Sequence, residues 1–277
     1  MKLLIFGLGY SAGFIAAAAR ARGWSVTGTT RDGRGDSLRF DDRGAVEAAL
    51  GAADAVLSSV PPAADRDPVL DRYGAALAGK RLGYLSSTGV YGDAGGAWVD
   101  ESAAIAGRRA GRNAADQAWL ARGARAYRLP GIYGPGRSAL DRVAAGAAHR
   151  VDLPGQVFSR IHVADLAAGV LAGLAGPPGA YNLADDLPCA QNAVIEFACR
   201  LLGRAPPPLQ SMDAAGLSPM ARGFYAENRR VANGKAKRLL GWRPVYADYR
   251  LGLRALKAIT SPASASSAPE TAKPDQR

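Results

Sequence analysis

The feature that most constrains this chain is a glycine-rich turn close to its start. Lys2–Phe6 is an apolar run of the kind found in buried parallel strands. It leads directly into Gly7–Gly13 (GLGYSAG), and the alanine-rich residues 12–22 that follow predict a helix. A strand, a glycine turn and a helix in direct succession are the setting in which such a turn binds the phosphates of a dinucleotide.

Each residue of the turn has a physical role in that interpretation. Gly7 lets the chain turn tightly off the strand, Gly9 lets the backbone approach a pyrophosphate, and Ala12 lets the helix pack closely on the sheet. The helix N-terminus offers unpaired N–H groups and a partial positive charge to the phosphates, with Tyr10 and the Ser11 hydroxyl beside them. Ordinary strand–helix turns share this pattern, so the turn alone does not decide the function.

A second strand is predicted at Ser25–Thr30, and it ends where dinucleotide-binding domains read the ribose. Arg31 follows at that point, where a carboxylate would favour the free 2′-hydroxyl of NAD. A guanidinium pairs well with a 2′-phosphate, so the sequence predicts NADP, with NAD as the alternative. A solvated loop arginine is the alternative interpretation of Arg31.

Strand and helix patterns continue to alternate along the chain. This alternation predicts an α/β fold with a Rossmann-type, doubly wound parallel sheet of order 3-2-1-4-5-6 plus a short extra strand. The further strands are predicted at Ser37–Phe40, Ala53–Ser58, Arg81–Ser86, Arg125–Leu129 and Ala180–Leu183. The helices are predicted near 44–51, 65–79, 107–122 and Val163–Leu174.

The sequence changes character after Gly131, where short elements are split by glycine and proline. We therefore predict two units and a tail. An NADP-binding Rossmann domain would comprise 1–135 and 161–185, and a small C-terminal substrate lobe would comprise 136–160 and 186–258. Residues 259–277 are rich in Ser, Ala and Pro and predict a disordered tail.

The net charge of +11 raises the question of nucleic acid as a partner. The arginines are scattered, and no aromatic residues interleave with them as a base-stacking platform requires. We therefore expect no nucleic-acid partner, and expect part of the charge to attract an anionic cofactor or substrate. Nucleic-acid binding remains an alternative that would show as salt-sensitive binding to any duplex.

Metal, membrane and secretion signals are weak. The two cysteines, Cys189 and Cys199, fit no zinc pattern and form no disulfide framework, so no metal and a reducing cytoplasm are expected. The apolar start imitates a secretory signal, but glycines interrupt it. No run of about 20 apolar residues could cross a bilayer, so no membrane partner is expected.

Five later segments, taken in order with the glycine turn, point to a family. The chain resembles the extended short-chain dehydrogenase/reductase superfamily, in its NAD-dependent epimerase/dehydratase group, over about residues 1–256. The resemblance implies a Rossmann domain with a small substrate lobe, a small-molecule substrate, and a homodimer as one state open to the chain. The segments are Leu85–Gly92 (LSSTGVYG), Tyr127–Arg137 (YRLPGIYGPGR), Ile161–Asp165 (IHVAD), Tyr181–Ala184 (YNLA) and Lys235–Pro244 (KAKRLLGWRP).

The resemblance implies further contacts with the cofactor. In the matching motifs Asp41 meets the adenine, Ser59 and Val60 line the cofactor through their backbone, and Pro130 and Gly131 flank the nicotinamide. It also implies mainly structural roles for three positions, which are His162, Asp165 and Asn182.

For catalysis, the resemblance places the family's Ser/Thr at Ser87, where it would hydrogen-bond the reacting oxygen of the substrate. The family's Tyr-x-x-x-Lys motif is missing. Registering Asp116 on the acidic residue that follows that motif puts Arg112 on the lysine and Arg108 on the tyrosine. Arg112 could hold ribose hydroxyls, but Arg108 is a poor acid or base because a guanidinium pKa exceeds about 12.

Two tyrosines and two arginines offer alternatives for the site. Tyr91 and Tyr133 lie near it and could act as the acid, although packing roles are favoured for both. Arg108 and Arg112 could bind an anionic substrate group, or could be solvated helix arginines.

One further position bears on the class of substrate. Phe158 stands where nucleotide-sugar enzymes of the group usually carry an arginine that meets the diphosphate. Arg160 is close, but in an extended segment it should point away, which weakens the case for a nucleotide-sugar substrate.

These observations predict an NADP(H)-binding oxidoreductase or epimerase of the YxxxK-lacking branch. Its substrate would be small and polar, with a sugar-derived compound as one option. The alternative is a catalytically silent NADP(H)-binding sensor or regulatory protein, which the loss of the Tyr-x-x-x-Lys motif favours.

Overall fold

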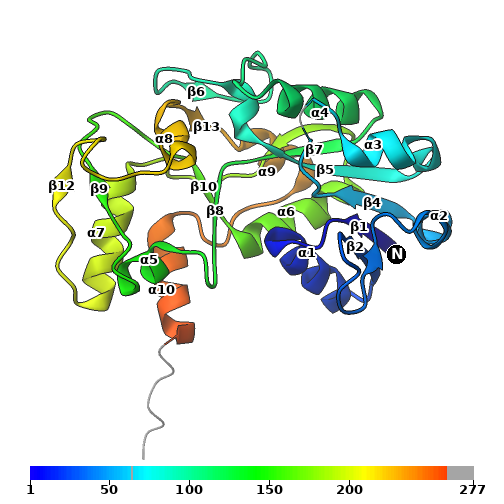
Figure 1. Ribbon diagram of the computed structural model, residues 1–277, viewed down its shortest axis with the longest axis horizontal. Coiled ribbons are helices and arrows are strands. Elements are labelled where there is room, and N and C mark those ends of the chain that lie inside the picture. Colours follow the sequence, from blue (N-terminus) through cyan, green and yellow to red (C-terminus); the bar gives the residue numbers. More distant parts are fainter. Residues whose placement is uncertain (64, 261–277) are drawn as a thin grey trace, which may run out of the picture.

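A seven-stranded sheet forms the centre of the computed structural model, which describes residues 1–63 and 65–260 (Figure 1). Every pairing in this sheet is parallel, in the order β11-β7-β5-β4-β1-β2-β3. This order confirms the predicted 3-2-1-4-5-6 arrangement with an extra outer strand. The strands are β1 (Lys2–Phe6), β2 (Ser25–Thr30), β3 (Leu38–Arg39), β4 (Ala55–Ser58), β5 (Arg81–Ser87), β7 (Arg125–Leu129) and β11 (Gly179–Asn182).

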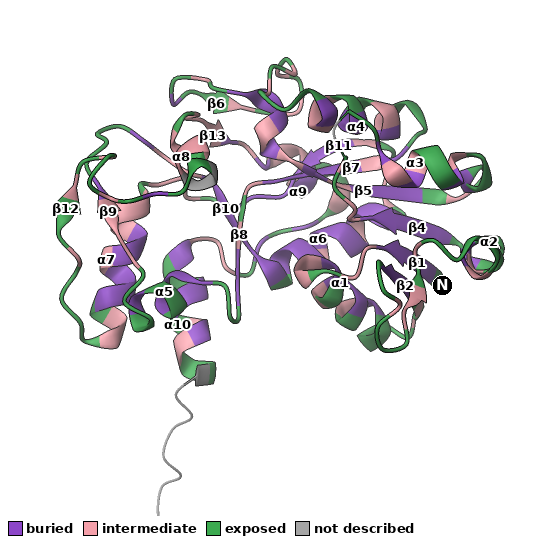
Figure 2. Ribbon diagram, in the orientation of Figure 1, coloured by how far each residue is buried: buried purple, intermediate pink, exposed green. Residues whose placement is uncertain are grey.

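Helices cover both faces of the sheet because its strands are apolar on both sides. Side chains alternate along β1, so Leu3 and Ile5 enter one core while Leu4 and Phe6 enter the other. In Figure 2 the central strands are mostly purple, which marks buried residues. The first core is covered by α1 (Tyr10–Ala21) and α6 (Val163–Ala175), and the second by α2 (Arg43–Ala52), α3 (Pro68–Tyr73) and α4 (Ala110–Ala121).

Two of the predicted helices are shorter than expected. In the predicted span 65–79, α3 ends at Tyr73 and a 3-10 turn, η1 (Gly74–Leu77), follows it. In the predicted span 107–122, α4 begins only at Ala110. The backbone N–H of Gly107 instead donates to the carbonyl of Val90, which holds this part of the chain in a loop.

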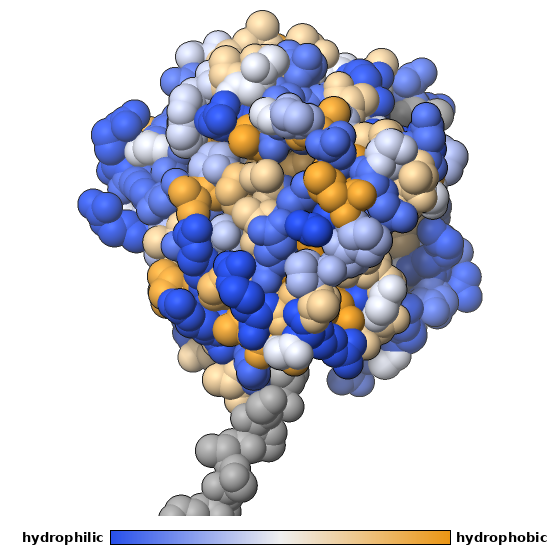
Figure 3. All heavy atoms as spheres, turned by 90° about the vertical axis from the view of Figure 1, so that its left-hand side faces the viewer, coloured by the Kyte–Doolittle hydropathy of each residue, from blue (hydrophilic) through white to orange (hydrophobic). Residues whose placement is uncertain are grey.

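A second group of elements forms a lobe with its own apolar core, on the left of Figure 1. The face of this lobe in Figure 3 is mainly hydrophilic, with apolar residues in small separate groups. The core helices are α5 (Ala139–Ala144), α7 (Gln191–Leu202) and α10 (Tyr249–Thr260). The remaining elements are η2 (Thr88–Tyr91), β6 (Trp98–Val99), β8 (Gly131–Tyr133), β9 (Arg150–Val151), β10 (Arg160–His162), β12 (Leu209–Gln210), α8 (Pro219–Tyr225), β13 (Arg230–Val231) and α9 (Gly234–Leu240).

The proposed division into domains stays a prediction. Helix α10 runs to Thr260, two residues into the span that we predict as a tail from residue 259. The rest of that span, 261–277, lies outside the described residues.

A buried polar network joins the sheet to α4. The Arg128 guanidinium forms an ion pair with Asp116 at 2.8 Å, and both side chains are almost fully buried. The Ser86 hydroxyl donates to the same carboxylate at 2.5 Å. Arg128 also donates to the Tyr91 hydroxyl at 3.1 Å, and that hydroxyl donates to Asn182 at 2.7 Å. These hydrogen bonds satisfy the buried polar groups that close this edge of the sheet.

Replacing Arg128 with leucine should destabilise the fold strongly, because it leaves the Asp116 carboxylate buried without its cation. We expect a loss of about 3–5 kcal/mol in the free energy of unfolding, measured by urea denaturation. The exposed Arg122→Leu is the matched control and should cost under about 0.5 kcal/mol. A loss below about 1 kcal/mol in Arg128→Leu would contradict the role assigned to this ion pair.

Candidate functional site

The glycine turn has the geometry that phosphate binding requires. Gly7 has a φ of +84°, and a Cβ there would lie 3.0 Å from the Ser59 hydroxyl and 3.1 Å from a methyl group of Val60. The Ser59 hydroxyl also donates to the Gly7 carbonyl. At Gly9, the N-cap of α1, a Cβ would meet nothing within 4 Å. Gly7 is therefore fixed by conformation and packing, whereas Gly9 leaves an open approach to the helix N-terminus.

The other residues of the turn differ in their surroundings. Ala12 is buried and belongs to the core between α1 and the sheet, as its predicted packing role requires, and Ser11 is half-buried. Tyr10 lies at the start of α1, and its hydroxyl donates to the carbonyl of Pro135 at 3.0 Å. The guanidinium of Arg137 lies 5.5 Å from the centre of the Tyr10 ring. Tyr10 therefore ties the turn to the loop that follows β8.

At the far end of this edge, Arg31 directly follows β2 and is exposed. Its guanidinium has no hydrogen bond or ion pair with any residue in the described part of the chain. The loop after it is ordered, since the Thr30 hydroxyl accepts hydrogen bonds from the backbone of Gly33 and Arg34. The guanidinium of Arg31 is thus unpaired beside an ordered loop. A side chain that binds a phosphate needs this arrangement.

Asp41, assigned by resemblance to the adenine, is exposed and already paired. Its carboxylate forms an ion pair with Arg39 at 2.9 Å. Hydrogen bonds from Arg39 hold the pKa of Asp41 below its ordinary value. The Asp41 carbonyl also accepts a hydrogen bond from Arg72 at 2.7 Å. The residue therefore lies at the rim of the predicted adenine end with its carboxylate occupied.

The predicted catalytic residues come together in one cavity. Ser87, Arg108, Arg112, Pro130 and Gly131 all line a cavity of about 760 Å³ between the sheet and the small lobe. The glycine turn and Arg31 do not belong to this lining. The structure thus brings the predicted positions together in two places, the edge of the sheet along the turn and the cavity beyond it.

Ser87 is the last residue of β5 and caps the short turn η2. Its hydroxyl oxygen accepts a hydrogen bond from the backbone of Gly89 at 3.1 Å. The side chain is half-buried and reaches the cavity. Within the described residues the hydroxyl proton is given to no acceptor, so it can be donated to an oxygen atom in the cavity.

Arg112 lies in the first turn of α4 and is held against the end of β5. Its guanidinium donates to the Tyr84 hydroxyl at 2.6 Å and to the Leu85 carbonyl at 3.4 Å. Burial raises the pKa of Tyr84 to about 12, so this hydroxyl stays protonated and accepts the hydrogen bond from Arg112. Arg112 is therefore a fixed positive charge at the cavity wall.

Arg108 precedes α4, so it does not occupy a helical position like the family's tyrosine. Its guanidinium donates to Glu227 at 2.7 Å and to the Gly223 carbonyl at 2.5 Å. Arg229 holds the other oxygen of Glu227 at 2.6 Å. Burial raises the pKa of Glu227, but the hydrogen bonds from both arginines outweigh it, and the net pKa is lowered. Arg108 thus acts as the partner of a carboxylate.

Neither alternative tyrosine offers its hydroxyl to the cavity. The Tyr91 hydroxyl is bound in the buried network with Arg128 and Asn182. The Tyr133 ring lines the cavity, but a Cβ at Gly252 of α10 would lie 2.1 Å from its hydroxyl oxygen. Burial raises the pKa of Tyr133 far above its ordinary value. Both residues fit the packing roles that the sequence favours.

The expectation that Arg160 points away from the site differs from the structure. Arg160 and Phe158 both line the cavity, because residues two apart in an extended segment point to the same side, so alternation places Arg160 beside Phe158 and not opposite it. The Arg160 guanidinium donates to the Phe158 carbonyl at 2.8 Å and to the Gln191 side chain at 3.0 Å. A buried arginine therefore does reach this wall of the cavity.

The IHVAD segment joins the two lobes, in agreement with its expected structural role. Both oxygens of Asp165 accept hydrogen bonds from the backbone of Val245 and Tyr246, at 2.8 and 3.0 Å. His162 caps α6 by accepting from the backbone of Ala164 at 3.2 Å. These contacts fasten the loop between α9 and α10 to the start of α6.

Asp185 is a buried acid that sequence reasoning missed. It is 1 % exposed, one of its oxygens has no hydrogen-bond partner within the described residues, and burial raises its pKa to about 8. A carboxyl with a higher pKa in the folded state contributes stability at low pH and loses it as the pH rises.

The stability of the protein should therefore fall between about pH 7 and pH 8. In this window the folded state keeps the Asp185 proton and the unfolded state, with a pKa of 3.8, does not. His162, whose pKa burial lowers to about 4, still binds a proton in the unfolded state near pH 6.5, and this opposing contribution fades as the pH rises toward 8. We expect Asp185→Asn to flatten a slope of at most about 1.4 kcal/mol per pH unit in urea unfolding.

The exposed Asp213→Asn is the control for this experiment, because its side chain is 91 % exposed. It should leave the slope as in the parent protein. An unchanged slope in Asp185→Asn would contradict the assignment of a proton to Asp185.

Metal and membrane sites were sought in residues 1–63 and 65–260. These residues contain no cluster of His, Cys, Asp and Glu that could hold a metal ion. They also contain no helix that is long and apolar enough to cross a membrane.

The sheet order, the glycine turn and the cavity define the class of fold. Structural neighbours are NAD-dependent epimerases, dehydratases and other extended short-chain dehydrogenase/reductase proteins, and the chain has their fold. One of them, the human epimerase family protein SDR39U1 with NADPH, is 17 % identical with a TM-score of 0.72, over 92 % of this chain and 99 % of that one. At this identity the likeness establishes the fold alone.

Closer relatives place the chain more narrowly. It belongs to the same family as a functionally unknown conserved protein from Silicibacter pomeroyi, which is 40 % identical with a TM-score of 0.82, over 93 % of this chain and 98 % of that one. Protein YeeZ of Escherichia coli K12 is 28 % identical over 282 residues, which cover 89 % of this chain and 97 % of YeeZ. No family model matches the chain.

Proposed function

We propose that this protein binds NADP(H) along the carboxyl edge of its sheet and acts as an oxidoreductase or epimerase on a small polar substrate in the adjoining cavity. The observation that carries this proposal is the meeting of Ser87, Arg112, Pro130 and Gly131 in one cavity next to that edge. Ligands of doubly wound sheets bind outside the carboxyl ends of the strands, where these residues lie.

The cofactor assignment rests on the turn and on Arg31. The open approach at Gly9 fits a pyrophosphate, and the packed Gly7 keeps the backbone in place to receive it. The unpaired guanidinium of Arg31 fits a 2′-phosphate, which supports NADP over NAD. Among the structural neighbours, SDR39U1 holds NADPH and a Thermus thermophilus UDP-glucose 4-epimerase holds NAD.

The chemistry would divide between the cofactor and the cavity residues. A bound nicotinamide supplies the hydride acceptor or donor. Ser87 would donate its hydroxyl proton in a hydrogen bond to the reacting oxygen, and Arg112 would fix ribose hydroxyls or stabilise negative charge. Because Arg108 is a poor acid and is held by Glu227, the proton that accompanies hydride transfer must come from another group.

Arg31→Ala should weaken NADPH binding by roughly 10- to 100-fold, since a charge-assisted hydrogen bond to a phosphate contributes about 1.5–3 kcal/mol. The affinity for NADH should not change, because NADH has no 2′-phosphate. Both affinities are measured by isothermal titration calorimetry, with the exposed Arg22→Ala as the matched control. Equal affinity for the two cofactors, unaltered in Arg31→Ala, would refute the assignment to NADP.

Ser87→Ala should lower turnover by about 10²- to 10³-fold, as expected for loss of one hydrogen-bond donor to a developing oxyanion. NADPH affinity should stay unchanged. The assay follows NADPH oxidation against a panel of carbonyl and sugar-nucleotide compounds, with Ser102→Ala, in a loop away from the cavity lining, as the control. Tight NADPH binding with no turnover on any compound would favour the silent sensor instead.

A further inference from the structure

The charge of the cavity is strongly unbalanced. Its lining contains seven arginines and only two carboxylates, Asp141 and Glu227. Glu227 is paired with Arg108 and Arg229. The other five arginines form no ion pair with any residue in the described part of the chain. The cavity therefore holds a surplus of positive charge that an anionic ligand would neutralise.

Arg142 differs from two of its neighbours in this surplus, Arg112 and Arg160. Arg112 and Arg160 are engaged by hydroxyl, carbonyl and amide oxygens of the protein. The Arg142 side chain extends from α5, keeps an accessible surface because it faces the cavity, and has no hydrogen-bond partner within the described residues. Surrounding protein desolvates its guanidinium, and Arg160 adds repulsion, so the pKa of Arg142 is lowered. The N–H donors of this group are therefore left to a ligand or to water.

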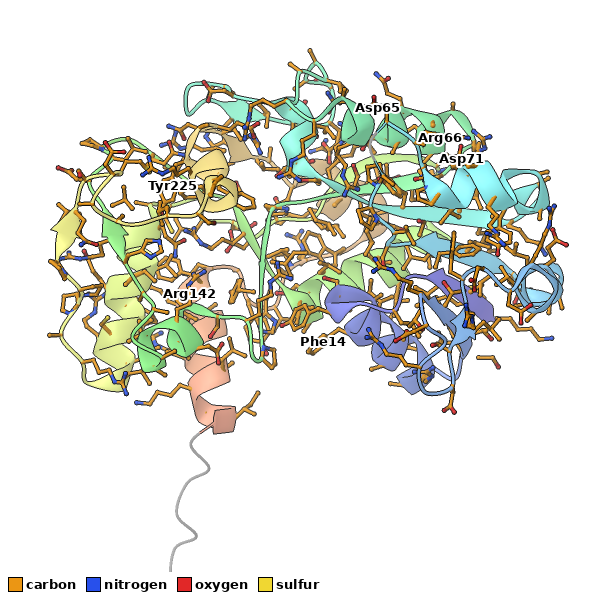
Figure 4. The ribbon with its side chains drawn as sticks, in the orientation of Figure 1. Phe14, Asp65, Arg66, Asp71, Arg142 and Tyr225 are labelled. Atoms are coloured by element: carbon orange, nitrogen blue, oxygen red, sulfur yellow. The ribbon has the colours of Figure 1, made fainter. Side chains whose placement is uncertain are left out.

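Two further polar side chains line the cavity near Arg142. Figure 4 shows Arg142 reaching up from α5 and Tyr225 on α8 above it. Burial raises the pKa of Tyr225, which keeps its hydroxyl protonated. His149 also lines the cavity, and burial together with the charge of Arg142 lowers its pKa.

The carboxylate of Asp141, which precedes Arg142 in the chain, already accepts hydrogen bonds. Asp141 accepts hydrogen bonds from the backbone and the hydroxyl of Ser138, at 2.7 and 2.6 Å, in the capping box of α5. Its charge acts on Arg142 from a distance, and the two residues form no ion pair. A guanidinium with a phenol and an imidazole beside it matches an oxygen-rich anion.

We propose that Arg142, with Tyr225 and His149, forms an anion subsite that binds a phosphate or carboxylate group of the substrate. The subsite lies on the small-lobe side of the cavity, whereas Ser87 lies at the sheet. The substrate would thus carry its charge at one end and its reacting carbon at the other. That this anion belongs to a substrate rests on the function proposed above, whereas the subsite itself does not.

The unpaired Arg142 should lower the stability of the folded protein when no anion is bound. An unpaired guanidinium that the protein desolvates destabilises the folded state until an anion joins it. Replacing Arg142 with glutamine should therefore leave the melting temperature unchanged or raise it, while abolishing the response to anions. A residue with a purely structural role would show the opposite pattern.

The test uses the full chain saturated with NADP⁺, so that the phosphate sites of the cofactor are filled. Inorganic phosphate and, separately, acetate are added at constant ionic strength, and the melting temperature and binding isotherm are recorded. Arg142→Gln is compared with Arg20→Gln, which lies at the far end of α1 from the turn, and with Arg142→Lys. We expect phosphate or acetate to bind the parent and Arg20→Gln at least about tenfold more tightly than Arg142→Gln, with partial recovery in Arg142→Lys.

The outcomes separate this proposal from the proposed function. If Arg142→Gln binds both anions as the parent does, or if neither anion binds the parent, the subsite is refuted even where NADPH binds normally. If the protein fails to bind NADP⁺ at all, the measurement is made on the unliganded Arg31→Ala protein. If anion binding then depends on Arg142, the subsite is supported and the proposed function is refuted. The anion that binds more tightly, phosphate or acetate, identifies the class of group that the substrate carries.

Discussion

The parallel register of the sheet is the constraint on which the rest of the structure depends. β1 pairs with β2 on one side and β4 on the other, so the chain leaves all three strands at the same edge. Gly7, Arg31 and Ser59 follow those three strands directly. Residues that are distant in the sequence are therefore brought to one surface by the direction of the strands. The strands are buried on both faces, so this edge is the side of the sheet left to meet a ligand.

The sequence predicted the sheet well because its signals are local. The apolar runs, the glycine turn and the alternation with helices fix strand order through general rules of connection. Packing roles for Ala12, Tyr91 and Asp165 also followed from motifs. Helix limits were less certain, because the start of α4 depends on a backbone contact between Gly107 and Val90 that no local pattern encodes.

The small lobe was predictable only as an outline. Arg108 and Glu227 are 119 positions apart, and no periodicity connects them. Arg160 was misplaced because it stands two residues after Phe158, a spacing that in an extended segment puts both side chains on the same side. Arg142, Tyr225 and His149 lie on short elements or loops whose order along the chain does not reveal what they face. Their charges and burial became informative only once the cavity had been located.

The hydrogen bond from Tyr10 to Pro135 has a consequence for how the two ends of the site communicate. Tyr10 opens the helix that follows the glycine turn, while Pro135 belongs to the loop that leads into α5 and Arg142. One hydrogen bond and a short stretch of backbone thereby connect the glycine turn to the helix that carries Arg142. The Tyr10 side chain therefore fixes the spacing between the start of α1 and the loop that leads into α5.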